Sequence, residues 1–545
     1  MDPASWAGFY FTNDDTNFAI ASLELGYLRR FVQGSGEFRN NRNQFIGLYV
    51  QDDFRVRRGL ILNLGLRWDP YFPWREIRGR IQVFDPKDFA SGTRSQHFAN
   101  SPAGLLFPQF GDPGPENGTT ADRNNLAPRL GFAWDVFGNG KTSLRGGAGV
   151  FYDSRQVANL TTVMSNSNAF GGVQLDITQP PGPFHRPLGP APSPFPGSPT
   201  PTRNTPFPSP VAVVTFPAGE KFKTTTAYNW NLAVERQLAA NLLGRAAYVG
   251  SHGSHILENL DLNAAVFTPG STLATDLRRP FRGLGQVRQA TPDVNANYHS
   301  LQLTLEKRGA GAGFWGRVTV LANYTYSKSI DTLPFGTNLT GFGGRLSVLS
   351  FTNPGRRQFE TGVSEFDHRH RIVTSYILPL PTFSGAHALV KHSLGGWRLG
   401  GILEAQTGGP MTILAGSDVS QTNIGSDRAN YAGGPVRGTA GCGSNEAPCV
   451  GYLNTAAFAR PATGSAGNIG KGAIRGPGLF GWDMGFFKQF PIREKAQIQL
   501  RFEYFNIFNR ANFQDPNNNF AAGGFGGIRG AFDPRIGQVA LKIIF

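Results

Sequence analysis

The sequence contains no long hydrophobic run. None of its 545 residues belongs to a stretch approaching the ~18 consecutive apolar residues that a membrane-spanning helix requires. Its mean hydropathy is negative, and no segment of ten or more residues shows a clear helical period. These absences exclude a helical membrane protein. They do not exclude a transmembrane β-barrel, because only alternate residues of a membrane-crossing strand have to be apolar.

Cysteine is nearly absent. The chain has two, Cys442 and Cys449, close together in a segment rich in Gly, Ser, Asn and Pro. No histidine flanks them, so a zinc site would lack ligands. In an oxidising compartment, the simplest expectation is a local disulfide within a loop.

Charged residues make up only 16% of the chain, with Lys+Arg 52 against Asp+Glu 37 and a net charge of +15. A basic balance usually raises the question of nucleic-acid binding. Here the basic residues are scattered through the chain and form no run, so we expect no nucleic-acid partner. A solvated surface, a lumen favouring anions, or contact with anionic lipid headgroups fits this distribution better.

The clearest positive signal is strict alternation at the C-terminus. Side chains of a strand alternate between its two faces, so residues two apart share a face. One face of the last strand is apolar, and the other carries Gln538, Ala540 and Lys542. This pattern suits a wall with lipid on one side and water on the other. For this strand alone, the end of a soluble sheet is an equal alternative. The apolar face consists of Val539, Leu541, Ile543 and Phe545.

Similar alternation recurs along the chain and predicts about fourteen strands, each near the ~9–11 residues needed to cross a bilayer at a tilt. The first candidate is the weakest. The predicted strands cover residues 17–31, 44–56, 60–68, 126–137, 142–152, 226–238, 241–250, 298–307, 317–327, 369–379, 396–406, 482–490, 496–508 and 535–545.

Short and long connections alternate regularly. The connections near residues 58, 139, 240, 311, 387 and 493 are short. Those over 70–125, 153–224, 251–297, 328–367, 407–480 and 509–534 are long. Short periplasmic turns and long outer loops are typical of outer-membrane barrels. The sequence therefore predicts an all-β fold, an antiparallel transmembrane β-barrel with long extracellular loops.

Two of the long loops stand out, and so do the tryptophans. The 153–224 loop is Pro-rich, and the 407–480 loop carries both cysteines. If Phe545 ends in the periplasm, Trp68, Trp230 and Trp482 lie near the outer ends of their strands and Trp134 and Trp397 near the inner ends. Such a pair of aromatic belts is expected at the two membrane interfaces.

The chain divides into a leading segment, 1–43, with weak strand candidates, and a barrel, 44–545. Its start has no basic region followed by an apolar core, so it is not a secretory signal. Because an outer-membrane protein must be exported, we expect that the recorded chain has lost its beginning.

No pattern predicts catalysis, a cofactor or a metal centre. The run 367–370 (Asp-His-Arg-His) and the pair His252 and His255 contain metal-ligand types, but both sit where strand ends meet headgroups and water. Asp52 and Asp53 are adjacent on a strand and therefore face opposite ways, so they cannot share a site. There is no nucleophile elbow, phosphate loop or zinc spacing, so we expect no enzyme.

Charged residues within strands are expected to face the lumen. An Arg or Lys on the lipid face near mid-bilayer costs ~2–4 kcal/mol, so the strand's polarity predicts its orientation. The residues expected to face the lumen are Arg67, Arg129, Glu235, Arg317, Arg501 and Glu503.

Several stretches together resemble the barrel of Oar-like TonB-dependent transporters. They are 43–54 (NQFIGLYVQDDF), 62–69 (LNLGLRWD), 127–135 (APRLGFAWD), 366–371 (FDHRHR) and 502–509 (FEYFNIFN). The terminal strand, with Val539, Leu541, Ile543 and Phe545, is similar to the signal read by the barrel-assembly machinery. The resemblance covers the chain from about residue 40 onward, each motif being weak alone and the match resting on their order and number.

This resemblance implies a barrel of about 22 strands, an N-terminal plug, and a segment that contacts TonB in the periplasm. The chain departs from that pattern, because it has no recognisable plug or TonB-contact segment and about eight strands fewer. TonB is therefore expected as a partner only if a missing plug is present. The other expected partners are outer-membrane lipid, the assembly machinery and an unknown ligand at the extracellular loops.

Our leading hypothesis is the C-terminal part of such a receptor in the outer membrane. One alternative is a self-sufficient porin or surface adhesin of about fourteen strands. Another is a soluble carbohydrate-binding or hydrolytic β-protein, which would stay in solution without detergent.

Overall fold

The computed structural model describes most of the chain. The described residues are 8–11, 19–34, 40–153, 174–178, 185–186, 188–190, 202–207, 210–217, 221–271, 273–334, 355–383, 385–424, 427–439, 449–493 and 496–545.

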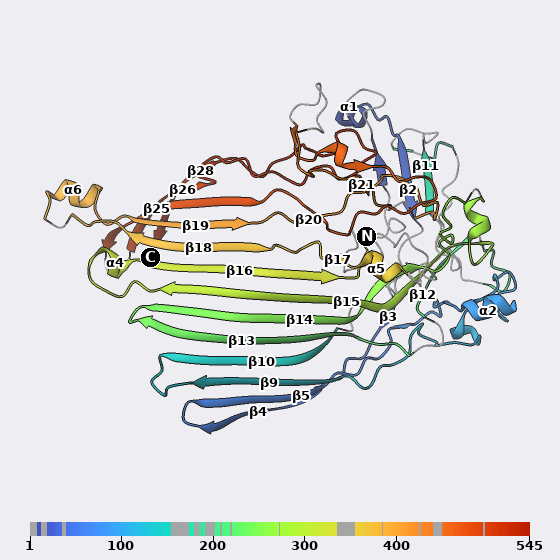
Figure 1. The fold of residues 1–545 in the computed structure, drawn as a ribbon, viewed down its shortest axis with the longest axis horizontal. Helices are drawn as coiled ribbons and strands as arrows, with labels where there is room; N and C mark the ends of the chain where they lie inside the picture. The colour runs from blue at the N-terminus through green and yellow to red at the C-terminus, as the bar shows by residue number, and fades with distance from the viewer. Residues whose placement is uncertain are drawn as a thin grey trace.

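Within these residues, the dominant feature is one sheet of fifteen strands (Figure 1). Thirteen of them follow a single path in which every neighbouring pair is antiparallel. The predicted all-β antiparallel architecture is confirmed. The thirteen strands are β4 (Leu48–Arg57), β5 (Leu60–Trp68), β9 (Leu126–Asp135), β10 (Thr142–Asp153), β13 (Thr225–Ala239), β14 (Leu242–Asp261), β15 (Leu284–Lys307), β16 (Thr319–Asp331), β18 (His370–Pro379), β19 (Arg398–Gln406), β25 (Leu479–Arg493), β26 (Ala496–Phe505) and β28 (Ile536–Ile544).

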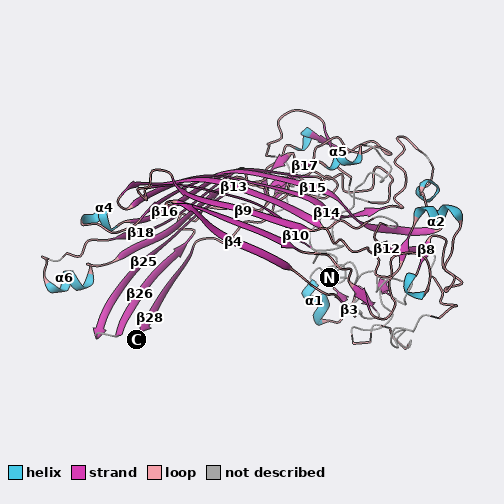
Figure 2. Ribbon diagram, turned by 90° about the horizontal axis from the view of Figure 1, so that it is seen from below, coloured by secondary structure: helices cyan, strands magenta, loops and turns pink. Residues whose placement is uncertain are grey.

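Two short strands complete the sheet at the loop end. β12 (Val211–Thr215) pairs in parallel with β15, and β17 (Gly362–Val363) pairs with β16. The outermost strands of the path are β4 and β28, and no pairing joins their free edges within the described residues. The sheet is therefore curved and twisted but open, as Figure 2 shows.

The strand register places apolar side chains on one face from the first strand to the last. Residues paired across antiparallel strands share a face. A second row on the same face contains Thr374, Leu403 and Trp482, and the last strands add Phe486, Phe502 and Val539. We call this surface the apolar face. One row across it runs Phe54, Leu62, Phe132, Gly146, Leu232, Tyr248, Leu301, Tyr326 and His370.

The opposite face carries small and polar residues. Between the same strands, Asn63 pairs with Gly131, and the row continues across the sheet. Most apolar-face leucines are far from buried; Leu64 is 44% exposed and Leu541 is 64% exposed. A surface this wide and apolar is stable only against another apolar phase. The remaining members of the polar row are Gly147, Asn231, Val249, Ser300 and Ser327.

Tight turns connect the strands at one end of the sheet. In the β9–β10 turn, Gly138 and Gly140 have φ of 69° and 70°, a conformation that favours glycine. The Asp135 carboxylate accepts hydrogen bonds from the backbone N–H groups of both, at 3.1 Å and 2.8 Å. The C-terminus lies at this same end (Figure 1), as the sequence predicted.

The helices in the described residues are all short. The described part of the chain holds no helix long and apolar enough to span a membrane. Two helices, α4 and α6, lie at the tight-turn end, and α2 and α5 lie among the long loops (Figures 1 and 2). The helices are α1 (Ala19–Glu24), α2 (Pro86–Ser91), α4 (Gly313–Arg317), α5 (Arg356–Glu360) and α6 (Ala388–Ser393), with 3-10 turns at Pro108–Phe110, Thr275–Arg278 and Thr455–Ala457.

The long loops gather at the other end and pair with one another there. The loop that follows β19 is joined to the loop that follows β26 by an antiparallel ladder between β22 and β27. The small strands are β1 (Gly8–Tyr10), β2 (Arg30–Gly34), β3 (Asn41–Arg42), β6 (Arg75–Glu76), β7 (Val83–Phe84), β8 (Leu105–Leu106), β11 (Gln174–Thr178), β20 (Pro410–Met411), β21 (Asn430–Tyr431), β22 (Val450–Gly451), β23 (Phe458–Ala459), β24 (Ile474–Arg475) and β27 (Gly527–Ile528).

Two predictions of secondary structure are corrected. The weak strand over 17–31 is wrong, since α1 occupies part of it and β2 belongs to a separate small sheet with β1 and β11. The loop predicted over 251–297 is much shorter, because β14 continues to Asp261 and β15 begins at Leu284. Both extensions lie beyond the alternating segments, where the hairpin packs among loops.

Candidate functional site

The buried hydrophobic cores of this molecule lie at the loop end. In the described part of the chain they form three clusters, and each combines residues that are far apart in sequence. The largest joins the 70–125 loop through Phe84 and Phe107 to β12 through Val213 and to the β14–β15 hairpin through Leu260 and Val287. The long loops therefore form a packed platform that can hold functional side chains in place.

A buried ion-pair cluster fastens α5 to this hairpin. The Glu258 side chain, fully buried, accepts from Arg356 Nη1 at 2.6 Å and from Arg357 Nη2 at 2.9 Å. Asp293 accepts from Arg356 Nη2 at 3.3 Å and is also paired with Arg357. Burial, reinforced by the nearby Asp293 carboxylate, raises the pKa of Glu258 to about 7, although the two arginines oppose this. The cluster joins three segments, β14, β15 and α5.

Two further buried pairs hold the loop that follows β19. Arg428 donates from Nη2 to Glu360 Oε2 at 2.7 Å, and Lys471 pairs with Asp331 at the end of β16. All four side chains are at most 5% exposed. Removing one partner of such a pair would leave a buried charge unpaired, so these contacts fix the loop's position.

An arginine-lined cleft of about 890 Å³ opens between these loops and the outer ends of β18 and β19. Four guanidinium groups line it, from Arg369, Arg437, Arg475 and Arg510. We call this feature the arginine cleft. Its walls also include His370 and the aromatic rings of Tyr452 and Phe513.

Close backbone contacts build the floor of the arginine cleft. β20 pairs with β24, setting Pro410 opposite Arg475. At Gly408, a Cβ would lie 1.9 Å from the carbonyl oxygen of Gly476. Only glycine therefore permits these two backbone segments to approach this closely. The backbone N–H of Gly476 then donates to Gly409 O at 2.8 Å. The sequence Gly476-Pro477-Gly478 thus carries Arg475 to the cleft.

The arginines are unequal in their partners. Arg475 is anchored, since Nη1 donates to the carbonyls of Asp367 and Gly408 at 2.8 Å and 3.3 Å and Nη2 pairs with the Asp367 carboxylate. Arg369 lies 3.9 Å from the same carboxylate. Within the described residues, neither Arg437 nor Arg510 forms an ion pair with a carboxylate.

These two arginines rest on aromatic rings. The Arg437 guanidinium stacks 3.8 Å from the Tyr452 ring centre, and the Arg510 guanidinium lies 5.3 Å from that of Phe480. Such contacts orient a guanidinium while leaving most of its N–H donors free. Partial burial lowers the pKa of Arg437.

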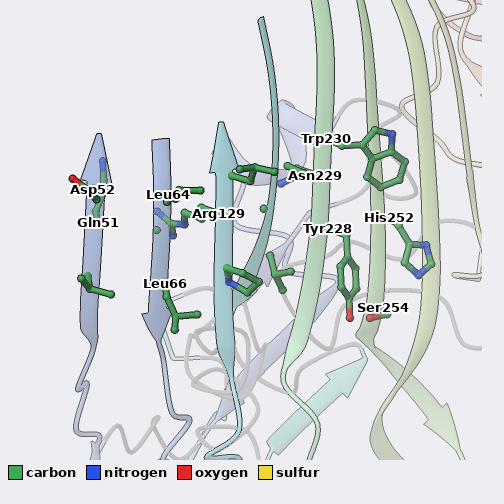
Figure 3. Close-up of a pocket in the computed structure, with 17 residues that line it drawn as sticks. Gln51, Asp52, Leu64, Leu66, Arg129, Tyr228, Asn229, Trp230, His252 and Ser254 are labelled. Atoms are coloured by element: carbon green, nitrogen blue, oxygen red, sulfur yellow. The ribbon is translucent and has the colours of Figure 1, made fainter. Parts of the chain in front are cut away.

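A larger hollow, of about 1150 Å³, lies on the apolar face (Figure 3). Leu64 and Leu66 of β5 line one side, and Tyr228, Trp230 and His252 line the other. Most of its lining surface is apolar, although Asp52, Arg129 and His252 are also among the lining residues. Because it belongs to the surface suited to lipid, we interpret it as a place for acyl chains and assign the polar site to the arginine cleft.

Five of the six residues expected to face the lumen do share the face opposite the apolar face. Their neighbours there are mostly polar or small. Glu235 lies 3.7 Å from Arg145, and Glu503 accepts from Gln538 at 2.8 Å. That this shared face lines a lumen stays a prediction. The five are Arg67, Arg129, Glu235, Arg501 and Glu503.

Arg317 is a correction. It ends α4 in the β15–β16 turn, and its Nε lies 3.3 Å from Gly313 O, to which it donates. It therefore has no place on a strand face. The turn contains Gly311, Gly313 and Gly316. Apolar residues alternate directly after Arg317, so the predicted strand began too early in the chain.

Of the remaining candidates, His370 begins β18 as expected, whereas the expected strand end at His252 and His255 is wrong, because both lie within β14. His252 lies on the apolar face beside Tyr228, whereas His255 has a positive φ of 55° and interrupts the β14–β15 register. Asp367 is buried against Arg475, and His370 Nδ1 lies 2.8 Å from the hydroxyl of Tyr324. No group of three or more ligating side chains that could hold a metal occurs in the described ranges. Asp52 and Asp53 pair with Leu64 and Asn63 and so face opposite sides.

The remaining predictions concern the two cysteines and the C-terminal strand. Cys442 lies outside the described residues, so its disulfide with Cys449 stays a prediction. Val539, Leu541 and Ile543 lie on the apolar face of β28, and Phe545 follows at the chain end, 97% exposed. Their reading by an assembly machinery likewise stays a prediction.

The arginine cleft was missed by sequence reasoning. Its four arginines are separated by up to 141 positions (369 to 510), and no local motif connects them. The available signal was indirect: Arg437, Arg475 and Arg510 fall in Gly-, Pro- and Asn-rich loops that open at the same end of the sheet.

Comparison with known proteins agrees with this architecture. A family model described as an outer membrane beta barrel domain matches residues 4–538. No curated protein matches the chain. Among solved structures, the outer membrane transporter YddB from Escherichia coli shares 11% identity at a TM-score of 0.45, with 92% of this chain and 45% of that one covered.

Two further structures are similar to the same extent. The FrpB iron transporter from Neisseria meningitidis shares 12% identity at a TM-score of 0.40, covering 92% of this chain and 44% of that one. A ferric enterobactin receptor (PfeA) variant from Pseudomonas aeruginosa shares 10% at 0.41, again covering 92% and 44%. The chain thus spans less than half the length of each. The family model matches nearly the whole length of the chain. This chain therefore belongs to the outer membrane beta barrel domain family, whose place is the Gram-negative outer membrane.

Proposed function

We propose that this chain is the C-terminal part of the barrel of a TonB-dependent, Oar-like outer-membrane receptor, which binds its ligand at the outer loops. The observation that carries the proposal is the combination of one continuous apolar face with two free sheet edges. Thirteen strands present that face, while β4 and β28 leave their outer backbone groups without a strand partner among the residues that the structure describes.

Free edges are costly in lipid. Unpaired backbone N–H and C=O groups in hydrocarbon each cost several kcal/mol, so membrane-spanning sheets close into rings. Receptors of the proposed type have about 22 strands, which leaves about nine to complete the ring. This supports a larger barrel over a self-sufficient porin of the strands seen here.

The loop end supports a receptor role. The loops fold into hydrophobic cores and are held by buried ion pairs, as rigid binding surfaces are. In the proposed receptor, the plug would fill the lumen and contact TonB. Coupled transport would require that plug, whereas ligand recognition would require mainly the loops.

The genomic sequence upstream of Met1 tests the proposal. We expect an in-frame signal sequence, a plug and about nine further strands. A stop codon and intergenic sequence directly upstream would contradict it. In that case, the chain purified alone in detergent should form a closed, heat-modifiable barrel that conducts ions.

A further inference from the structure

We propose that the arginine cleft binds anionic groups, carboxylate or phosphate, of a ligand that reaches the outer end of the sheet. This deepens the proposed function and rests on it for the ligand's biological role. The binding itself depends only on the cleft.

The first step of the argument is convergence. Arg369 precedes β18, Arg475 ends β24, and Arg437 and Arg510 belong to two different loops. Four separate segments therefore deliver the same functional group to one cleft. A guanidinium presents a planar fork of donors that matches carboxylate and phosphate oxygens.

The second step is the charge balance. One buried carboxylate, Asp367, serves both Arg475 and Arg369. A second carboxylate, that of Asp515, lies close to Gly476, and burial raises its pKa. Like charges that line one cleft repel one another, and a bound anion relieves that repulsion.

The third step distinguishes the arginine that holds the loop in place from the arginines available to a ligand. Arg475 satisfies backbone carbonyls of the strand ends, so its role includes holding the loop. Arg437 has one such bond, from Nη2 to Arg475 O at 2.9 Å, and Arg510 rests on Phe480. Both side chains are exposed to the solvent that fills the cleft. Arg437 and Arg510 are therefore the donors available to a ligand.

The fourth step is size. A cleft of about 890 Å³ is within the ~300–1,000 Å³ that small-molecule sites occupy. Tyr452 and Phe513 add apolar surface beside the charges. A ligand with two or more anionic groups on a partly apolar body fits this lining.

The anionic groups could come from a soluble ligand or from the phosphates of an outer-leaflet lipid. The full chain in neutral detergent is titrated with pyrophosphate and, separately, with citrate. In a second arm, nanodiscs of neutral lipid with and without added lipid A hold the same protein, and bound lipid A is quantified. The first arm reports soluble anions and the second reports lipid phosphate.

The test variants are Arg437→Gln and Arg510→Gln, alone and combined. The matched control is Arg460→Gln, an exposed arginine of the same loop outside the cleft whose Nη2 contacts Ser417. All these side chains are exposed, so the fold should persist, and far-UV circular dichroism checks this for each variant.

We expect saturable binding in at least one arm, weakened about tenfold or more by the double variant and unchanged by Arg460→Gln. Binding should also weaken as salt is raised. Absence of saturable binding in both arms would overturn the proposal, and so would equal loss in the Arg460→Gln control. Either failure would leave the receptor proposal standing, because that proposal is decided by the upstream sequence.

Discussion

At the scale of single residues, the fold depends on which face of a strand each side chain occupies. Leu303 of β15 pairs with Ala246 and Tyr324 on the apolar face, while its neighbour Gln302 pairs with Ala247 and Thr325 on the opposite face. The two positions lie on a central strand and differ by one step along the chain. They form a matched pair for testing the two faces.

Leu303→Arg should destabilise the protein in lipid vesicles by ~2–4 kcal/mol, because it places a charge in hydrocarbon near mid-strand. Gln302→Arg should change the free energy of unfolding far less, because its side chain meets a polar face. Urea unfolding in vesicles measures both. Equal destabilisation by the two substitutions would contradict the face assignment.

Residue faces were predictable from the sequence because alternation is local. The placement of Arg67, Glu235 and Arg501 on one face needed only the period of their own strands. Arg317 failed because apolar residues alternate after it, from Val318 to Tyr324, and the pattern does not reveal where the strand starts. The pairing of Arg475 with Asp367 was out of reach, since nothing in either segment identifies the other.

At the scale of elements, the tight turns set the register of neighbouring strands. Gly140 has a positive φ, and its N–H is held by Asp135. Gly140→Ala should lower the free energy of unfolding by about 1–2 kcal/mol, because an L side chain is strained there. Lys141→Ala, in the same turn, serves as the control and should change little. Matching losses in both variants would argue against a glycine-specific turn.

The stability of the buried ion-pair cluster that fastens α5, which we call the α5 clamp, should depend on pH. The pKa of Glu258 is raised from 4.5 to about 7 in the folded protein. Between these values the folded state binds more protons than the unfolded state, so this group's contribution to stability falls as pH rises. We expect slower hydrogen exchange in the amides of α5 at about pH 5.5 than at about pH 8, after correction for intrinsic rates.

Glu258→Gln should abolish this pH dependence, since no titrating group remains at that position. Asp276→Asn, at an exposed carboxylate whose side chain is 89% accessible, should retain it. Tighter protection at the higher pH, or an unchanged pH profile in Glu258→Gln, would show that Glu258 does not control the clamp.

Element boundaries were predictable only where lipid shapes the sequence. Thirteen of the fourteen predicted strands appear in the main path, because each carries the alternation that a bilayer demands. The extensions of β14 to Asp261 and of β15 from Leu284 lack that pattern, since packed loops surround them. The helix α1 was mistaken for a strand because a short apolar run fits either period.

At the scale of the whole molecule, the sheet and the loop end are stabilised by different contacts. The sheet buries little against itself, and its apolar face has to be covered by hydrocarbon. The loop end, by contrast, has conventional cores around Phe84, Ile413 and Phe216. The parity of short and long connections made this division predictable, whereas the arginine cleft, assembled from four segments, was not.

The most direct test of the account is to determine which face of β15 meets lipid. Cys442 and Cys449 are replaced by Ser, and a fluorescent thiol probe is attached at single positions from 301 to 306 in vesicles containing brominated lipid. We predict strong quenching at Leu301, Leu303 and Leu305 and weak quenching at Gln302, Thr304 and Glu306. Uniform quenching, or stronger quenching at the polar positions, would contradict the central claim that the apolar face is the membrane surface.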